Sequence, residues 1–475
     1  TIESAHALDT SLIHPNHLFY EGFGYLIYKA VRGIGLDVRA IAVLQITNSF
    51  LSALAALLLF HILRLTVRSL YLSAALTFLF AFSATWWKFS IDANAYVPSV
   101  LFILLSFYLI LPNNKPRPLL LALCYSLSMC FHQLAVIFFP VLVLGLFLQT
   151  PEHDVRHRAL TVFKFSLAAF VLTFGTYYYF FYLATATLDF GRLLRWMTSF
   201  SPDASFSFDA VSNLSYTLRG FARLFFGGRF NLLKGIINPF VIALLVVLAI
   251  LAALLILKVI RNLGGLKSSA KRALKYDARL KPVLLLCALW VAVYTAFLFV
   301  WLPHHTFYRL FYLPALILLI GILLAGGASQ VPPARTYVLA LVVALMSLCN
   351  FLFLIFPYSH VGKYPPLAMA LEMNKVWPRG TVVYYSLTNA DASLFRYFNP
   401  PTVWKQLNTG TIAELENELR SIHSTGGTVW LEVTAIEQLL STPEASAWLA
   451  AHAREESRRE LVDKAYKIKF VQVVP

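Results

Sequence analysis

The fold class is decided by apolar runs such as residues 282–302, PVLLLCALWVAVYTAFLFVWL. This run carries no charged side chain, and about 20 apolar residues are what a helix needs to cross a bilayer. The segment before it, 258–281, holds eight Lys or Arg residues against the single acid Asp277. Because comparable runs recur along most of the chain, the sequence predicts an α-helical polytopic membrane protein.

The composition agrees with this interpretation. The chain has 475 residues, of which 59% are hydrophobic and 13% charged, and its mean hydropathy is +0.69. Soluble domains carry roughly 25% charged and about 45–50% apolar residues. An ordinary soluble enzyme is therefore excluded, and a chain this apolar is not disordered.

Ten apolar runs are interpreted as membrane-spanning helices. Two of them, 118–132 and 133–149, are short, and they also fit one broken helix or a re-entrant hairpin. The predicted spans are 40–63, 70–87, 96–111, 118–132, 133–149, 160–185, 239–258, 282–302, 310–328 and 336–356.

The basic residues orient the predicted spans. Loops rich in Lys and Arg stay on the cytoplasmic side, so the segment 258–281 is predicted to be inside. All of the net charge of +16 belongs to 1–358, because 359–475 holds 12 basic and 12 acidic residues. The charge thus orients a membrane domain, and we expect no nucleic-acid partner. The segments predicted to lie outside are 1–39, 88–95, 186–238, 303–309 and everything after 357.

The cysteines bear on the compartment. The hydrophilic parts contain none, so no disulfide framework staples an exported domain. This favours a bacterial inner membrane over a eukaryotic lumen. Because the chain begins at Thr1 without Met, we also expect a further helix before it. The four cysteines, all in apolar runs, are Cys124, Cys130, Cys287 and Cys349.

Residues 358–475 are predicted to form a small α/β domain on the periplasmic side, separate from a membrane domain 1–357. Strands that alternate with helices are typical of such a domain. The predicted strands are 380–386, 428–433 and 466–474, and the predicted helices are 412–422, 435–440 and 444–461.

The acidic residues of the membrane domain avoid the centres of the predicted spans. A proton-coupled transporter is expected to carry carboxylates within the membrane, so their distribution disfavours that class. Eight acids fall on the predicted outer side: Glu3, Asp9, Glu21, Asp37, Asp92, Asp189, Asp203 and Asp209.

The first outer loop is dense in groups that can carry chemistry. Carboxylates and imidazoles in one stretch offer a general base and metal ligands. The alternative is a solvated interfacial helix with incidental polar residues. The candidates in this loop are Glu3, Asp9, His14, His17, Tyr20 and Glu21.

Two further turns add candidates. Asp92, Asn94 and Tyr96 follow a Trp-Trp pair, although Asp92 or Asn94 could simply cap the helix that begins near Tyr96. His132 ends a predicted span, where a structural hydrogen bond is the alternative to substrate binding.

Arginines on the predicted outer side indicate an anionic ligand. Arg309 follows the pair His304 and His305, and a guanidinium suits bidentate binding of phosphate. For the imidazole pair, metal ligation is a further option. Contacts with lipid headgroups are the alternative for the arginines of the long outer loop, which include Arg219, Arg223 and Arg229.

In their order along the chain, these features resemble the GT-C superfamily of membrane glycosyltransferases, and within it the bacterial protein O-mannosyltransferase-like group. The resemblance covers most of 1–320 and includes a soluble outer C-terminal domain. The acidic pair of the family's first loop appears only as Glu3, so its partner would precede Thr1 or be replaced by Asp9. The matching elements are Glu3, the turn His14-Pro15-Asn16-His17 with Tyr20, the stretch Asn48 to Leu54, Trp87 with Asp92 to Tyr96, His132, and Arg309 to Pro314.

The resemblance implies an inverting transfer of a sugar from a polyprenyl-phosphate donor to a protein, lipid or glycan acceptor. It implies a carboxylate base, expected among Glu3, Asp9 and Asp92, and often a divalent cation such as Mg²⁺ or Mn²⁺, expected at Glu3 and Asp9. We expect Arg309, with Arg219, Arg223 or Arg229, to hold the donor phosphate. The expected substrate-binding residues are His14, His17, Tyr20, Glu21, Asn94, Tyr96, His132, His304 and His305.

Two other functions remain open at this point. One is a transporter or flippase for a lipid-linked saccharide, which predicts polar residues at mid-membrane depth. The other is a noncatalytic GT-C-like subunit of an envelope membrane complex.

Overall fold

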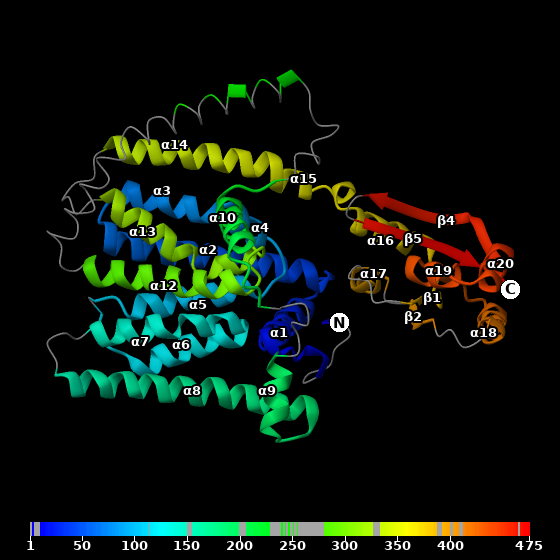
Figure 1. The fold of residues 1–475 in the computed structure, drawn as a ribbon, viewed down its shortest axis with the longest axis horizontal. Helices are drawn as coiled ribbons and strands as arrows, with labels where there is room; N and C mark the ends of the chain where they lie inside the picture. The colour runs from blue at the N-terminus through cyan, green and yellow to red at the C-terminus, as the bar shows by residue number, and fades with distance from the viewer. Residues whose placement is uncertain are drawn as a thin grey trace. The chain divides into compact units, whose positions relative to one another are not determined.

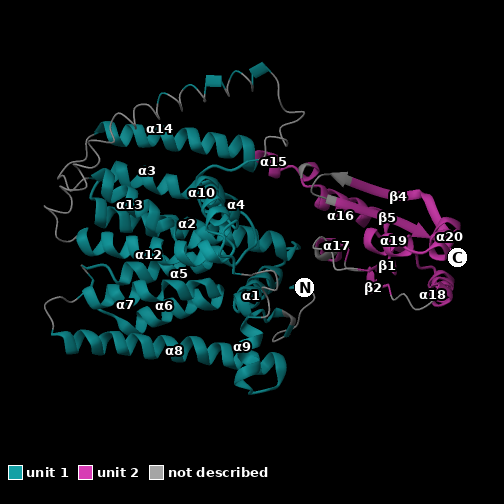
Figure 2. Ribbon diagram, in the orientation of Figure 1, with its two compact units in different colours: residues 1–355 teal, residues 356–475 magenta. Residues whose placement is uncertain are grey.

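A computed structural model gives the fold of the chain, which divides into two compact units, Thr1–Ile355 and Phe356–Pro475 (Figure 2). The boundary lies two residues before the predicted one. The structure describes residues 2–3, 10–112, 114–149, 154–198, 206–228, scattered positions from 239 to 254, 280–325, 333–386, 392–399, 402–407, 412–463 and 466–475.

The first unit is helical throughout its described part (Figure 1). Short 3-10 turns at Thr10–Leu12 and Pro15–His17 precede the first long helix. The α-helices are α1 Tyr20–Gly33, α2 Ala40–Val67, α3 Leu70–Ala81, α4 Ala84–Ser90, α5 Tyr96–Leu109, α6 Pro118–Phe131, α7 Phe139–Leu148, α8 Val155–Thr185, α9 Phe190–Thr198, α10 Ala210–Phe225, α12 Leu280–Val300, α13 Leu313–Ala325 and α14 Pro333–Asn350. The 3-10 helices η3 Gln133–Phe138 and η5 Phe307–Phe311 and the π-helical turn η6 Phe351–Ile355 complete the unit.

The membrane-protein class predicted from the sequence is confirmed. Among the described residues, four helices are long and apolar enough to cross a bilayer: Ala40–Val67, Val155–Thr185, Leu280–Val300 and Pro333–Tyr358. A fifth span exists if α3 and α4, which meet at an angle of 68°, are taken together. The remaining apolar helices are shorter, because a helix of 14 residues rises only about 21 Å. The predicted span 239–258 lies mostly outside the described residues.

The predicted pair 118–132 and 133–149 forms two helices, α6 and α7. Between them, His132 is extended and the chain continues as the 3-10 helix η3. The break places the polar side chain of His132 between the end of α6 and the start of η3.

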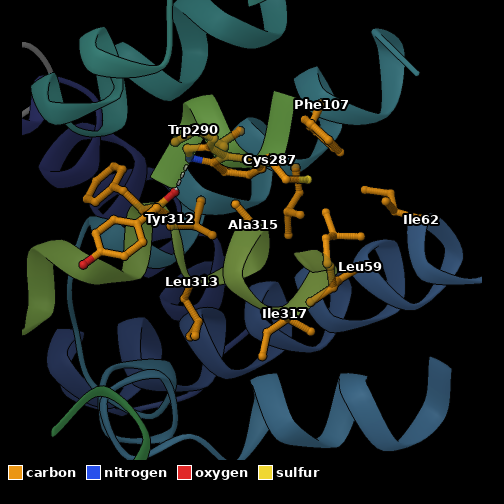
Figure 3. Close-up of a cluster of buried hydrophobic side chains, with 14 of the residues drawn as sticks. Leu59, Ile62, Phe107, Cys287, Trp290, Tyr312, Leu313, Ala315 and Ile317 are labelled. Carbon is orange, nitrogen blue, oxygen red and sulfur yellow. Dashed lines mark hydrogen bonds between the residues drawn. The ribbon is translucent and has the colours of Figure 1, made fainter. Parts of the chain in front are cut away.

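The core of the first unit lies between α2, α3, α5, α6, α12 and α13. Large side chains fill it, and the indole of Trp290 satisfies its N–H by donating to the carbonyl of Phe311 at 3.0 Å (Figure 3). By contrast, α8 contacts mainly α6 and α7, and little of its surface is buried. Most of the surface of α8 is therefore free for lipid.

The second unit is a five-stranded sheet covered by helices on both faces. The strand order is β2-β1-β3-β5-β4, with β1 parallel to β2 and β3, and β5 antiparallel to β3 and β4. One face packs on α16 Pro365–Val376 and α17 Ala392–Phe398, and the other on α18 Ile412–Ser424, α19 Val433–Leu439 and α20 Pro443–His452. The strands are β1 Val382–Tyr385, β2 Val403–Gln406, β3 Val429–Glu432, β4 Ala453–Asp463 and β5 Tyr466–Val473.

The predicted helix 444–461 is wrong beyond His452. There the chain turns into β4, which pairs with β5 although its Glu and Arg residues favour a helix. Pairing along the edge of the sheet outweighs this local preference, and the ion pair between Arg458 and Glu460 neutralises neighbouring charges on the strand. The sequence also failed to predict the short strand β2.

Candidate functional site

Segments far apart in the sequence converge at one end of the first unit. The rings of His14 and His17 lie 4.1 Å apart, His17 lies 6.5 Å from His132, and His132 lies 4.9 Å from Tyr96. Tyr308 of η5 lies 6.0 Å from the ring of His132. We call this group, together with Tyr20, Glu21 and Asp92, the first-loop cluster.

The first loop is held in place by its own turn and by α8. His14 precedes the 3-10 turn, and its Nδ1 accepts a hydrogen bond from the backbone N–H of Asn16. The hydroxyl of Tyr177 on α8 lies 3.1 Å from the carbonyl oxygen of Pro15. Leu18 is buried directly after the turn, so that Tyr20 and Glu21 begin α1 at a fixed position.

Asn48 on α2 positions the turn that carries Asp92. Its amide is fully buried and donates to the backbone carbonyls of Asp92 at 2.7 Å and Asn94 at 2.8 Å. Asn94 in turn accepts from the N–H groups of Tyr96 and Val97, which makes Asn94 a cap of α5. The Asp92 carboxylate accepts from its neighbour Ala93 through one oxygen. The capping alternative thus applies to Asn94, whereas Asp92 keeps an oxygen for other partners.

Two carboxyl groups of the cluster lie close to Tyr20. Burial raises the pKa of the Tyr20 hydroxyl, and the charges of Asp92 and Glu21 add to that effect. Burial also raises the pKa of Asp92, against the opposing effects of the Ala93 N–H and of Lys88. It raises the pKa of Glu21 to about 7. Both acids therefore take up protons more readily than free carboxyl groups.

His17 and Glu21 are one helical turn apart, with Nδ1 and Oε1 separated by 3.6 Å. Burial, reinforced by the neighbouring His14, lowers the pKa of His17 to about 4. His17 is consequently neutral in the range where Glu21 titrates, and the two do not form an ion pair there. Burial also lowers the pKa of His14 and of His305.

The Glu21 pKa gives a prediction for stability. A carboxyl whose folded-state pKa lies above its unfolded value stabilises the fold when protonated, and this stability is lost as the pH rises from about 4.5 to about 7. Each pKa unit corresponds to 1.36 kcal/mol, so the wild-type protein should lose up to about 3 kcal/mol of unfolding free energy over this pH range. In Glu21→Gln, which cannot titrate at this position, we expect that loss to be absent. The check is the unfolding free energy of both proteins at pH 5 and pH 8. An equal pH dependence in the two proteins would contradict the assignment.

Glu3 has a structural task in this fold. Its Oε1 accepts from the backbone N–H of Ala40 at 2.9 Å, where α2 begins. A carboxylate at this position satisfies an N–H that the helix leaves open and complements the positive end of the helix dipole. The candidates Asp9 and Arg229 lie outside the described residues. Of the two described acids expected to act as the base, Asp92 belongs to the cluster and Glu3 caps α2.

The predicted metal site, Glu3 with Asp9, lies partly outside the described residues and stays a prediction. Of its two predicted ligands, Glu3 caps α2 and Asp9 is not described. The described part of the chain contains no group of three or more His, Cys, Asp or Glu side chains that could hold a metal ion. We therefore derive no step through a metal.

The burial of Arg309 does not fit the phosphate contact predicted for it. Its guanidinium is fully buried and donates to the hydroxyl of Tyr312 at 2.8 Å and to the carbonyl of Pro303 at 2.9 Å. A Cβ added at Gly220 of α10 would overlap its Nε and lie 2.7 Å from its Cζ. Because no surface is left for a phosphate, Arg309 holds the 303–309 turn against α10.

The turn that Arg309 holds carries other predicted residues. His304 lies 4.2 Å from His305, ring to ring, and His305 lies 5.7 Å from Tyr308, which connects this turn to the cluster. The ring of Tyr216 on α10 lies 6.2 Å from His304. Arg219 and Arg223 follow Tyr216 on α10 and are exposed, so they remain available to an anion.

Lys88 was missed by the sequence reasoning. It is exposed on α4, one turn before Asp92, and its charge lowers the pKa of that carboxyl. Helix α10 packs against α4, which brings Arg219 and Arg223 to the neighbouring helix. The signal was present in the segment Trp86 to Tyr96, where Lys88 is the only cation.

An apolar cavity of about 610 Å³ adjoins the cluster. Its walls include residues next to cluster residues in the sequence: Phe19 beside Tyr20, Gly22 beside Glu21, and Phe131 beside His132. The remaining lining comes from the first loop, α1, α2, α5, α6 and α8 and is almost entirely apolar. The polar cluster and the apolar cavity thus share the first loop with α1 and the end of α6, as an amphipathic ligand requires.

Comparison with solved structures identifies the architecture. ArnT from Cupriavidus metallidurans bound to undecaprenyl phosphate superposes with a TM-score of 0.58, over 99% of this chain and 91% of that chain, at 10% sequence identity. The apo state of the same protein gives a TM-score of 0.59, over 99% and 90%, at 12% identity. This chain has the ArnT-like GT-C fold. No protein-family model and no curated protein matches its sequence.

The GT-C fold expected from the ordered motifs is thereby confirmed. At 10–12% identity the likeness extends to the fold alone, so the narrower resemblance to the protein O-mannosyltransferase-like group stays a sequence-based expectation. The roles of the cluster residues rest on their own geometry.

Proposed function

We propose that the chain is a glycosyltransferase that moves a sugar from a polyprenyl-phosphate donor to an acceptor hydroxyl. The observation that carries this proposal is that two part-buried carboxyl groups, Asp92 and Glu21, lie close to Tyr20, whose neighbours in α1 line an apolar cavity of about 610 Å³. The GT-C fold supports it, and ArnT has been solved with undecaprenyl phosphate bound.

The cavity is the proposed site for part of the polyprenyl chain. Its apolar lining favours an isoprenoid over a hydrated sugar, because burial of apolar surface contributes about 25 cal/mol per Å². The phosphate would then lie at the polar edge of the cavity. Lys88, Arg219 and Arg223 are the exposed cations on the two adjoining helices and are proposed to bind it.

Asp92 is proposed as the general base. Its carboxylate takes the proton of the acceptor hydroxyl while the acceptor oxygen forms a bond to the anomeric carbon. The bond between that carbon and the phosphate oxygen breaks, and polyprenyl phosphate leaves with the electron pair. Negative charge grows on the leaving phosphate, so fixed cations stabilise the transition state more than the ground state. Attack opposite to the leaving group inverts the configuration.

The other cluster residues are proposed to bind substrate. His14, His17 and His132 offer imidazole donors and acceptors suited to sugar hydroxyls, and Tyr96 and Tyr308 offer aromatic faces. His304 and His305 lie on the turn that faces α10. We propose these binding roles together with a periplasmic location of the cluster in a bacterial inner membrane. The acceptor is proposed only as a hydroxyl group of a protein, lipid or glycan.

Filling the cavity tests the donor site. Gly22 lines the cavity and a Cβ there would meet nothing within 4 Å, so Gly22→Leu extends an apolar side chain from the cavity wall. We expect the KM for a polyprenyl-phosphate sugar to rise about tenfold or more, because an excluded isoprene-sized group removes ~1.5–3 kcal/mol of apolar burial. The measurement is transfer of radiolabelled sugar by the purified chain in proteoliposomes.

Gly33→Leu is the matched control for this variant. Gly33 ends the same helix α1, also has open space at its Cβ, and does not line the cavity. Equal KM values in the two variants would overturn the donor site. Translocation of the lipid-linked sugar without transfer would favour the flippase alternative. Absence of both activities in the wild-type chain would favour the noncatalytic subunit.

A further inference from the structure

A second apolar groove lies on α8, on a surface that the proposed reaction does not use. Its volume is about 360 Å³, and it is lined by Phe174, Gly175, Tyr178, Tyr179, Tyr182 and Leu188. The hollow exists because Gly175 has no side chain: a Cβ there would meet nothing within 4 Å. Any residue with a longer side chain at this position would fill the groove.

Contacts within the chain hold the groove in place, and it continues toward α9. The hydroxyl of Tyr178 donates to the backbone carbonyl of Leu188 at 2.6 Å, which ties the segment after α8 back onto the helix. The ring of Phe174 lies 6.0 Å from the ring of Phe190, the first residue of α9. The groove is therefore fixed at the point where the chain turns from α8 into α9.

Helix α9 has the pattern of a helix that lies in a membrane interface. Leu193 is fully buried, whereas Phe190 and Leu194 are 55% and 47% exposed. The cations Arg192 and Arg195 are exposed on the same short helix. Exposed apolar side chains beside exposed arginines are typical of helices that insert at the level of lipid headgroups.

The depth of the groove suits the acyl region just below that interface. Gly175 precedes the end of α8 at Thr185 by ten residues, which corresponds to about 15 Å along the helix axis. The three tyrosines of the groove lie nearer to that end, as expected for aromatic residues close to a membrane surface.

The lining favours a thin chain over a partner helix. Membrane helices that pack closely use small residues at a spacing of four, which lets their backbones approach. Around Gly175, the residues at that spacing are Val171 and Tyr179, and both are bulky. A hollow of about 360 Å³ with bulky aromatic walls suits a narrow acyl chain better than a helix.

We propose that this groove binds one acyl chain of an anionic membrane phospholipid whose headgroup phosphate lies on Arg192 and Arg195. The partner is a bulk lipid of the bilayer and is distinct from the polyprenyl donor. The proposal is independent of the proposed transferase activity, because it concerns another cavity and other cations.

Native mass spectrometry of the full chain tests the proposal. The protein is released from nanodiscs of equal parts phosphatidylglycerol and phosphatidylcholine, and retained lipids are counted by mass. We expect one phosphatidylglycerol per wild-type chain. Gly175→Leu should lower that occupancy about tenfold and Gly175→Ala less, because the longer side chain fills the space. The control Val171→Leu adds apolar surface to α8 outside the groove and should retain the lipid.

The arginines make a separate prediction about lipid class. The double variant Arg192→Gln with Arg195→Gln should lose the preference for phosphatidylglycerol over phosphatidylcholine. We expect the ratio of the two retained lipids to fall about tenfold, because the charge-assisted bonds to phosphate are lost. Equal retention by Gly175→Leu and wild type would overturn the proposal. So would displacement of the lipid by polyprenyl phosphate, which would make the groove part of the donor site, or specific retention of a second protein there.

Discussion

Replacement of Asp92 by Asn should lower the rate of sugar transfer by about a thousandfold, within the range that general bases contribute. The amide keeps the size of the side chain and the hydrogen bond from the Ala93 N–H, but it cannot take a proton from the acceptor. The measurement is a single-turnover rate with radiolabelled polyprenyl-phosphate sugar in excess of its KM. Binding of the donor should change little, so the loss should appear in kcat.

Asp37→Asn is the control for this experiment. Asp37 lies in the same outer region of the sequence, but its side chain is 94% exposed and pairs with Arg32. Surface ion pairs of this kind contribute about 0–1 kcal/mol, so transfer should be retained. If Asp92→Asn transferred sugar at the wild-type rate while Glu3→Gln did not, the base would be Glu3, and the capping role assigned to Glu3 would be incomplete.

Replacement of Gly220 by Val should destabilise the first unit by about 3 kcal/mol or more. A side chain at this position would displace the guanidinium of Arg309 from Tyr312 and Pro303. A buried charge that loses its partners costs about 3–5 kcal/mol. Unfolding monitored in detergent with increasing denaturant gives the free energy of both proteins.

A double-mutant cycle makes this prediction specific to the contact. Arg309→Met removes the charge and leaves a flexible apolar side chain that can move away from a valine. Gly220→Val should then cost much less in the Arg309→Met background than in the wild type. Additive effects of the two substitutions would show that Gly220 and Arg309 do not depend on each other.

Part of the candidate site could be predicted because its residues are unusual for their surroundings. His14, His17, Glu21, Asp92 and His132 are polar groups at the ends of apolar runs, and the fold brings them together. The chain's local signals could not reveal their partners. Asn48 reads as an ordinary polar residue of a membrane span, yet it holds the Asp92 turn across 44 residues of sequence.

Other expectations failed where a long-range contact outweighed a local signal. Arg309 has the chemistry of a phosphate ligand, but its position opposite Gly220 buries it. Residues 453–461 have the composition of a helix, but β5 offers them an edge to pair with. Lys88 was overlooked because one exposed lysine is common, and only its effect on Asp92 gives it a role.

The sequence by itself determined that this is a polytopic helical membrane protein with a small α/β unit and the GT-C order of motifs. Run length, charge and strand–helix alternation are properties of local sequence, and the bilayer makes them decisive. Only the tertiary structure decided that Asp92 lies close to Tyr20, that Arg309 is buried, and where two apolar cavities open. These features depend on distances between segments that are far apart in the sequence. Hydrogen bonds such as that of Asn48 set those distances, and so does the absence of a side chain at Gly22, Gly175 and Gly220.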